Sequence, residues 1–412
     1  MNVSSALGIS MIGFSTALVF GLGCRGDSRA ASVQVRDSAG VEVVFNTGPL
    51  TQVPAVWTVN ADPILSIGAV EGEEAYQFLG IAGAHRLSDG RIGVVNAGSR
   101  EVRFYDARGS HLATVGGRGG GPEEFEAPAM AGSIGDTLII VDRAYHRLTF
   151  VHPDAGFVGL ARVSDEVGGF LNPVGTLAGG RSVFGGAFDM RRIGELHNGM
   201  NRAHTYYRAC NPDGSLAVDF GDKVGAEFFI RDLEAGGQES RPALVPFGRM
   251  PVATASSSHL YFSDQDTWEV EVHAADGTLV RLIRQEWEPV PVEQQHAERY
   301  IEDVVAREGD PEGARRMREY LRRIPVPGHF PPFADLLADR LGYLWVEDYP
   351  TPGTEDSRWT VFNSEGVRTA RVTLPPRFNP IEIGADYILG LGWDELRVEY
   401  IRMYALERPV GD

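Results

Sequence analysis

Cysteine is scarce in this sequence of 412 residues, which contains only Cys24 and Cys210. Two cysteines cannot build a disulfide framework, and Cys210 falls in an expected strand, so we predict that it packs in the core. Basic residues are also fewer than acidic ones: the chain has 38 Lys and Arg and 56 Asp and Glu, which gives a formal net charge of −18. Such an acidic chain argues against nucleic acid and anionic membrane surfaces as partners.

Several catalytic motifs are missing. The sequence has no HExxH and no GxSxG, and the glycine-rich run at 116–128 is not followed by Lys-Ser or Lys-Thr. The usual sequence support for a zinc protease, for a nucleophile elbow and for a phosphate-binding loop is therefore lacking. A zinc site would need histidines from separate repeats to converge, drawn from His85, His146, His204 and His259.

Charged residues are absent from residues 1–23, and residues 6–23 are apolar or small throughout. A run of this length predicts a secretory signal rather than a membrane-spanning helix. Gly23-Cys24 resembles the bacterial lipobox, in which the cysteine becomes a lipid-modified N-terminus, although Gly21 stands where Leu is usual. We expect a signal peptide at 1–23, a linker at 24–32, lipidation of Cys24, and a location in the cell envelope facing the periplasm or the outside. A plain signal peptide or an uncleaved anchor is the alternative.

Glycine and proline are plentiful, with 50 Gly and 24 Pro, which suits many short strands and turns. Residues 81–116 contain four short stretches that read as strands, divided by turns that include Gly90 and Gly109. One four-stranded unit cannot bury both of its faces alone. It therefore predicts neighbours of its own kind.

Similar units recur along the chain, at residues 137–158, 181–218, 259–284, 344–373 and 387–406. Six copies of a four-stranded antiparallel unit predict an all-β fold over residues 33–412, a six-bladed β-propeller. The copy at 387–406 ends where its last strand should begin. We therefore expect a strand from the hairpin at 32–46, or from the stretch at 56–68, to close the ring.

Four segments carry a family resemblance: GRGGGPEEFEAP, AHRLSDGRIGVVN, DSAGVEVV and GYLWVEDY. Together they resemble bacterial six-bladed β-propeller lipoproteins related to NHL-repeat proteins. The resemblance covers nearly all of the mature chain and implies the fold. It does not specify the function, because propellers host lyases, hydrolases, sensors and plain scaffolds.

Loop lengths differ between the two sides of the predicted ring. Turns between first and second strands, and between third and fourth strands, are short, and we call their side the short-turn face. The long segments fall on the opposite side, which we call the loop-elaborated face, at 116–128, 187–203, 221–250, 285–333 and 349–357. Because binding usually takes place at loops elaborated on a rigid scaffold, we predict the functional site on the loop-elaborated face.

A helical insertion is predicted at 292–323, within one of these long segments. Its apolar residues keep helical spacing, and Asp310-Pro311 supplies an N-cap and a first-turn proline for the second helix. That second helix is rich in arginine. Either it is a solvated helix packed against the ring, or it presents arginines to an anionic ligand.

Polar and aromatic residues gather at the ends of the predicted second strands, on the loop-elaborated face. The candidate ligand-binding residues are Arg118, Asp142, Arg143, His146, Asp264, Asp266, Trp268, Asp348, Tyr349 and Trp393. Structurally, an Asp at such a corner accepts backbone N–H groups. Functionally, Asp142, Asp264 and Asp348 could hold a divalent cation, Ca²⁺ or Zn²⁺, and no other cofactor is predicted.

Two functions remain open. The first is a non-enzymatic, envelope-anchored monomer that binds a peptide, a glycan or a protein partner on the loop-elaborated face. The second is a metal-assisted lyase or hydrolase that works at the channel mouth.

Overall fold

The computed structural model describes residues 32–186, 190–234, 241–351 and 356–409. The expected signal peptide and Cys24 lie outside these residues. The described chain is nearly all β-structure, with two α-helices and two short 3-10 helices, η1 (Glu74–Tyr76) and η2 (Met190–Glu195). Within the described residues, no helix has both the length and the apolar character needed to cross a membrane.

Two sheets consist of four antiparallel strands in sequence order. The first contains β6 (Ile81–Arg86), β7 (Ile92–Asn96), β8 (Glu101–Tyr105) and β9 (His111–Gly116). The second contains β10 (Pro128–Ile134), β11 (Thr137–Asp142), β12 (Arg147–His152) and β13 (Gly156–Arg162). The four strands expected at 81–116 are therefore confirmed.

Two further four-stranded groups belong to one larger sheet, in which β14 and β19 pair in parallel at Gly175 and Ala255. One group contains β14 (Asn172–Leu177), β15 (Arg181–Gly185), β16 (Gly199–Cys210) and β17 (Leu216–Ile230), with β18 (Ala243–Leu244) at its edge. The other contains β19 (Val252–Ala255), β20 (His259–Ser263), β21 (Glu269–Ala274) and β22 (Leu279–Gln285).

The last two sheets each recruit N-terminal residues. One contains β23 (Leu336–Ala338), β24 (Leu344–Glu347), β25 (Ser357–Phe362) and β26 (Arg368–Leu374), with β3 (Ala55–Val56) added in parallel. The other contains β27 (Phe378–Ile383), β28 (Tyr387–Trp393) and β29 (Glu399–Glu407), and its fourth position is filled by β4 (Thr58–Val59) and β5 (Leu65–Ile67). The N-terminal stretch at 56–68 thus supplies the strand that the last repeat lacks.

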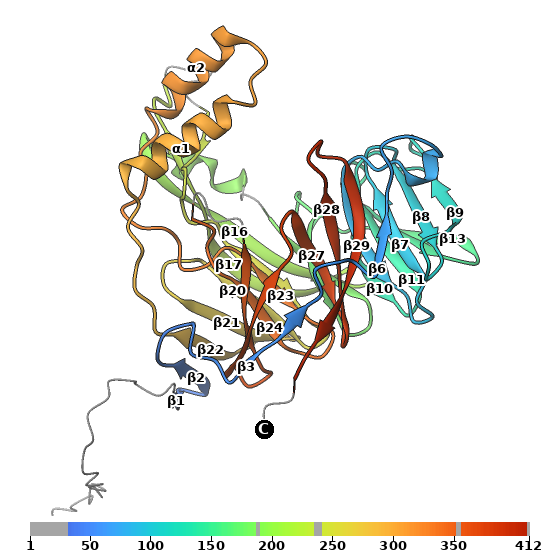
Figure 1. Cartoon of the computed structure of the whole chain (residues 1–412), viewed down its shortest axis with the longest axis horizontal. Coiled ribbons are helices and arrows are strands. Elements are labelled where there is room, and N and C mark those ends of the chain that lie inside the picture. The colour runs from blue at the N-terminus through green and yellow to red at the C-terminus, as the bar shows by residue number, and fades with distance from the viewer. Residues whose placement is uncertain (1–31, 187–189, 235–240, 352–355, 410–412) are drawn as a thin grey trace, which may run out of the picture. The chain divides into compact units, whose positions relative to one another are not determined.

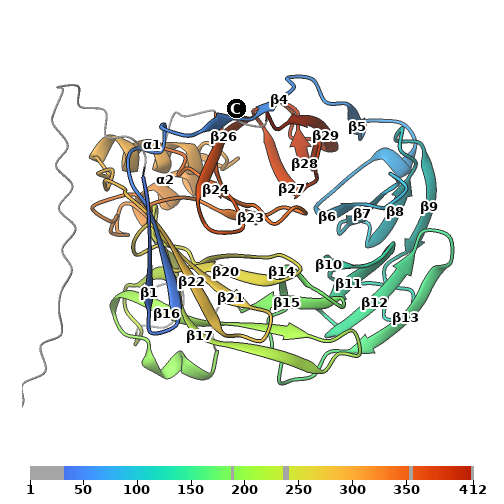
Figure 2. The same ribbon diagram turned by 90° about the horizontal axis from the view of Figure 1, so that it is seen from below.

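The N-terminal segment runs along the outer strands of three sheets. The hairpin of β1 (Val33–Ser38) and β2 (Val41–Asn46) turns at Ala39 and Gly40, whose φ angles of 54° and 86° fit a two-residue hairpin loop. Strand β2 pairs in parallel with β22, then β3 joins β26, and β5 joins β29. Figure 2 shows the sheets following one another around a common centre, the arrangement of a propeller-type fold.

The core lies between successive sheets. Trp268 shows how this differs from the sequence prediction, because its side chain is 4% exposed and its ring centroid lies 5.0 Å from that of Phe333 and 5.2 Å from that of Phe362. We predicted Trp268 as a ligand-binding residue on the loop-elaborated face, but its indole packs inward between two sheets. Cys210 is buried as predicted, and burial raises the pKa of its thiol to about 12.

The predicted helical hairpin is confirmed as α1 (Gln294–Val305) and α2 (Pro311–Leu321), which project from the sheets in Figure 1. Asp310 caps α2 by accepting the N–H groups of Glu312 and Gly313. The hairpin packs on a small apolar cluster that includes Val245, away from the main core. Arg318 donates to both carboxylate oxygens of Glu302, at 2.7 and 2.8 Å, which ties the two helices together.

Candidate functional site

The first strands of the sheets surround a cavity of about 630 Å³. Each of β6, β10, β14, β19, β23 and β27 contributes at least one residue to its wall, including His85, Ser133, Thr176, Ala255, Ala338 and Glu382. We call this space the central cavity. Its size lies in the usual range for a site that holds a small molecule.

The central cavity reaches the short-turn face. Its wall includes Ser256, Ser257 and Ser258, which lie between β19 and β20, and Asp339, Arg340 and Gly342, which lie between β23 and β24. None of the ten candidate residues from the loop-elaborated face is part of this wall. The cavity shared by the first strands therefore lies away from the side that loop lengths favoured.

Polar side chains from the sheets of β6, β10, β23 and β27 meet at the central cavity. His85 Nδ1 lies 2.7 Å from Glu382 Oε2, and His85 Nε2 lies 3.0 Å from the Ser133 hydroxyl. Arg340 Nη2 donates to Glu382 Oε2 at 2.8 Å and lies 3.2 Å from each ring nitrogen of His85. Tyr387 donates its hydroxyl to Glu382 Oε1 at 2.6 Å. Glu382 is thus the centre of this cluster.

The Glu382 side chain is only 10% exposed, yet its surroundings keep it ionised. Burial alone would raise the pKa of its carboxyl group, but the hydrogen bond from His85, the charge of Arg340 and the Tyr387 hydroxyl outweigh burial and hold the pKa below its ordinary value. Arg340 is 40% exposed and His85 is 19% exposed, so a cation and an imidazole remain accessible from the cavity.

A β-bulge positions Ser133. The pairing of β10 with β11 shifts register between Met130 and Gly132, and Gly132 has a φ of 143°. A Cβ atom at Gly132 would also collide with Thr176 Oγ1 of the next sheet, so glycine permits both the backbone angle and the close approach. Bulges of this kind change the direction of the neighbouring side chain, here that of Ser133.

Asp142 lies at the end of β11, the second strand of its sheet, where we predicted a polar corner, and it mainly accepts hydrogen bonds from the backbone. Asp142 is fully buried, and its carboxylate accepts the N–H groups of Glu126, Ala127 and Ala144 at 3.0 to 3.2 Å. These bonds fit the cap role that we considered for it in the sequence. Arg147 lies 3.7 Å from the same carboxylate.

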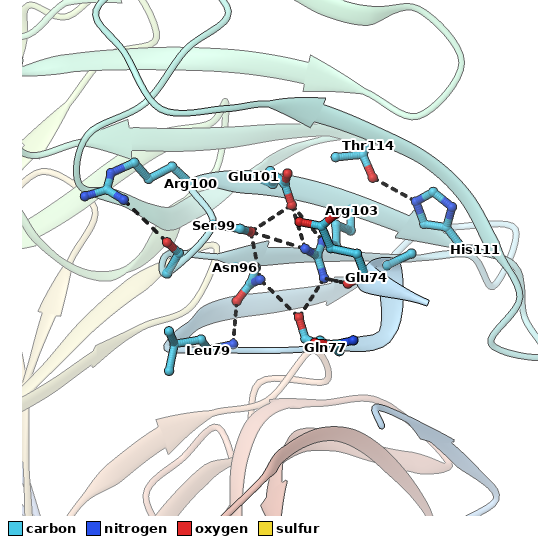
Figure 3. A network of polar contacts seen from close by, with 12 residues as sticks. Glu74, Gln77, Leu79, Asn96, Ser99, Arg100, Glu101, Arg103, His111 and Thr114 are labelled. Carbon is cyan, nitrogen blue, oxygen red and sulfur yellow. Dashed lines mark hydrogen bonds and ion pairs between the residues drawn. The ribbon is translucent and has the colours of Figure 1, made fainter. Parts of the chain in front are cut away.

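Asn96 occupies the equivalent corner in the sheet of β6 to β9, which is shown in Figure 3. Its amide accepts the Leu79 N–H at 2.9 Å and donates to the Ser99 hydroxyl at 2.8 Å. The neighbouring Arg103, 2% exposed, donates to the carbonyl groups of Glu74 and Gln77 at 2.8 Å each. This network fastens the segment ahead of β6 to the sheet, and its buried arginine has a structural role.

Asp348 and Glu347 form an acidic corner in the sheet of β23 to β26. Burial raises the pKa of both carboxyl groups, although Asp348 pairs with Arg371 and Glu347 accepts the Ser357 hydroxyl at 2.8 Å. Burial also raises the pKa of Tyr349 to about 12.

Asp266 is the predicted residue that makes the most ion pairs. It pairs with Arg202 at 2.6 Å and with Arg249, and it lines a hollow of about 270 Å³ together with Gln265 and His329. Asp264 accepts the N–H of Asp266, which makes it a turn-forming residue.

The other predicted residues are spread over the surface. Trp393 lines a separate hollow of about 660 Å³ with Arg377 and Arg402. Arg118 is exposed and lies 3.6 Å from Glu126, and Arg143 is exposed. His146 has a φ of 49°, as expected at a tight corner. The ten candidates are therefore divided among several corners and do not form one site.

We predicted that Asp142, Asp264 and Asp348 could hold a divalent cation. Within the described ranges, no three His, Cys, Asp or Glu side chains are grouped in a way that could hold a metal ion.

Sequence reasoning missed Ser133, Arg340 and Glu382 and considered His85 only as a zinc ligand. Ser133, Arg340 and Glu382 lie 48, 255 and about 300 positions from His85, so no local motif unites the four residues. One signal was available: His85 and Ser133 each lie close after a glycine in a first strand, in GAH and GS.

Comparison with known proteins gives no family assignment. No protein-family description matches the chain, and no curated protein matches it. Among solved structures, an exported protein from Bacteroides fragilis is 7% identical, with a TM-score of 0.48 over 89% of this chain and 100% of that one. A member of the DUF4221 family from Bacteroides vulgatus is 8% identical, with a TM-score of 0.48 over 86% of this chain and 100% of that one.

Virginiamycin B lyase from Staphylococcus aureus is a third similar structure. It is 10% identical, with a TM-score of 0.39 over 86% of this chain and 96% of that one. At these values the likenesses carry no argument about chemistry, which must come from the residues of this chain.

Proposed function

We propose that this protein is an exported, six-bladed β-propeller whose central cavity binds a small anionic molecule. The observation that carries the proposal is the convergence of six first strands on one cavity of about 630 Å³, with Arg340 and His85 on its wall. Glu382 pairs with Arg340 through one carboxylate oxygen at 2.8 Å, but the Arg340 side chain is still 40% exposed. The exposed guanidinium of Arg340 remains suited to a carboxylate or a similar oxyanion.

Matched pairs of carboxylate and primary-amide fragments test this proposal by ligand-observed NMR. We expect the carboxylates to bind more tightly than the amides, because only they gain from the charge of Arg340. Arg340→Gln should remove that preference. Arg377→Gln, in the separate hollow beside Trp393, is the matched control and should leave it intact. The proposal fails if Arg340→Gln keeps the preference or if only Arg377→Gln loses it.

Closure of the ring by N-terminal strands is part of the proposal. It is supported by the pairing of β5 with β29 and by the bonds from the Ile81 N–H to Glu399 and from the Arg86 N–H to Glu382, which join the sheet of β6 to β9 to the sheet of β27 to β29. A chain that starts at Glu71 would lack β1 to β5 and expose the edges of three sheets. It should lose cooperative unfolding or aggregate, whereas a melt as sharp as that of the mature protein would refute closure.

Anchoring through Cys24 follows from the lipobox resemblance. Cells fed a fatty-acid analogue should label the wild-type protein and not Cys24→Ala. Equal labelling of both would leave the secretory signal without a lipid anchor.

A second candidate function is the binding of a peptide, a glycan or a protein on the loop-elaborated face. The hollow beside Asp266 favours it, because Arg249 lines it together with aromatic and proline residues, and Asp266 also pairs with Arg202. Asp266→Ala should then abolish partner capture and leave carboxylate fragments bound in the central cavity.

A further inference from the structure

Three side chains in the central cavity stand in the order nucleophile, base and orienting carboxylate. The Ser133 hydroxyl lies 3.0 Å from His85 Nε2, and His85 Nδ1 lies 2.7 Å from Glu382 Oε2. They come from β10, β6 and β27. We propose that Ser133 is a catalytic nucleophile that hydrolyses a carboxylic ester bound in the central cavity, with His85 as general base. The inference rests on the proposed ligand-binding role of this cavity.

The nearby carboxylate favours one tautomer of His85. An ionised carboxylate accepts only, so the Glu382 oxygen 2.7 Å from Nδ1 favours the hydrogen on that nitrogen of a neutral His85, although Arg340 Nη2 lies 3.2 Å from both ring nitrogens. The lone pair of Nε2 then faces the Ser133 hydroxyl, as proton abstraction requires. Tyr387 and Arg340 hold Glu382 in place at 2.6 and 2.8 Å. Glu382 is therefore a positioning residue, which acts through His85.

The reaction can be written with every atom accounted for. The Ser133 oxygen attacks the ester carbonyl carbon while its proton moves to His85 Nε2, and the carbonyl electron pair moves onto oxygen. The exposed Arg340 guanidinium on the same wall stabilises the resulting oxyanion. Collapse of this intermediate breaks the bond to the alkoxy group, which leaves as an alcohol with the proton from His85.

Water completes the cycle. It attacks the acyl group on Ser133 while His85 accepts its proton, and the carboxylic acid leaves as Ser133 recovers its hydrogen. No oxidant or cofactor enters either half of the reaction. The product is a carboxylate, which is the class of ligand that Arg340 is suited to bind.

Fluorophosphonate labelling of the purified full chain tests the nucleophile directly. The Ser133 oxygen should displace fluoride from phosphorus, and peptide mapping should place the adduct on Ser133. Ser133→Ala should abolish labelling without changing the thermal melt. Ser364→Ala is the control, because Ser364 is exposed in the turn between β25 and β26 and is not part of the cavity wall, and it should label at the wild-type rate.

The roles of the other two residues predict different readouts. His85→Gln should slow labelling by about 10²- to 10⁴-fold, the usual contribution of a general base. Glu382→Gln should slow labelling at least about tenfold and Glu382→Asp should restore part of that loss, whereas a merely structural role would move the melt alone.

Two negative results have separate meanings. If the wild-type protein is not labelled, or is labelled at another residue, while carboxylate fragments still bind in an Arg340-dependent way, the nucleophile is refuted and the binding cavity stands. If the fragments also fail to bind, the proposed function fails with it.

Discussion

Asp142 and Glu382 are both buried carboxylates, but they take their hydrogen bonds from different parts of the chain. Asp142, near the loop-elaborated face, accepts backbone N–H groups from residues no more than sixteen positions away. Glu382, in the central cavity, is held by the side chains of His85, Arg340 and Tyr387, two of them from other sheets. A carboxylate with local backbone donors fixes a turn, whereas one held by distant side chains marks a site that the whole fold must assemble.

Electrostatics separate the same two regions. The pKa of Glu382 is lowered because cationic and hydroxyl partners outweigh its burial. The pKa values of Glu347 and Asp348 are raised because burial outweighs their partners. The surroundings of Glu382 in the central cavity therefore favour its ionised form, whereas burial at the acidic corner favours the protonated forms of Glu347 and Asp348.

The largest effect on stability should come from Trp268, whose position we had assigned to ligand binding. Trp268→Ala should lower the free energy of unfolding by about 3–5 kcal/mol, because it leaves a cavity between Phe333 and Phe362. Chemical denaturation measures the loss. Trp393→Ala, at a half-buried corner, should cost far less. If Trp268→Ala left the unfolding transition unchanged, packing between Phe333 and Phe362 would contribute less to stability than we infer.

Asp142→Asn should have the next largest effect. Both oxygens of Asp142 accept N–H groups, so an amide nitrogen must face at least one donor. We expect a loss of about 1.5–3 kcal/mol in unfolding free energy, the range for hydrogen bonds to a charged group. Carboxylate-fragment binding should persist. If the variant kept its stability but lost carboxylate-fragment binding, Asp142 would have a role in binding rather than the structural role that we assign to it.

The pH dependence of stability should distinguish the two regions by sign. Glu382 has a lowered pKa, so its contribution is complete above the unfolded-state value, near 4.5, and is lost as pH falls through the folded-state pKa. Glu347 and Asp348 have raised pKa values, so their contribution is lost as pH rises. Glu382→Gln should therefore weaken acid destabilisation, as measured by melts from pH 6 downwards. An unchanged acid limb would contradict this assignment.

The smallest effect should come from Arg143, an exposed residue of the loop-elaborated face. Arg143→Ala should change the free energy of unfolding by less than about 0.5 kcal/mol and leave fragment binding and fluorophosphonate labelling unchanged. A loss of labelling in this variant would mean that the two faces are coupled.

The fold was largely predictable because its signals are local. Gly90 and Gly109 mark turns, and Asp310-Pro311 marks a helix start, each within a few residues of the structure it specifies. The sequence showed that the last repeat lacks a strand, but it did not show which N-terminal strand fills that place, because β5 and β29 lie more than 300 residues apart.

The site was not predictable in the same way. The prediction followed loop length, which placed the function on the loop-elaborated face, whereas the cluster around Glu382 depends on first strands meeting in three dimensions. Ser133 faces His85 because of a bulge at Gly132, and bulge positions are not encoded by strand alternation. Trp268 was misplaced for a related reason, since sequence alignment gives a position along a strand but not the direction of the side chain.

The N-terminal hairpin has a mechanical consequence. Tension on the residues ahead of Val33 would first reach β1, an exposed edge strand, and would separate it from β2 one residue pair at a time. Beyond it, β2 is secured by five paired positions along β22 and by the buried amide of Asn46, which bonds to Gly366 and Arg368. Strand β1 should therefore detach under load before the sheets around the central cavity are disturbed.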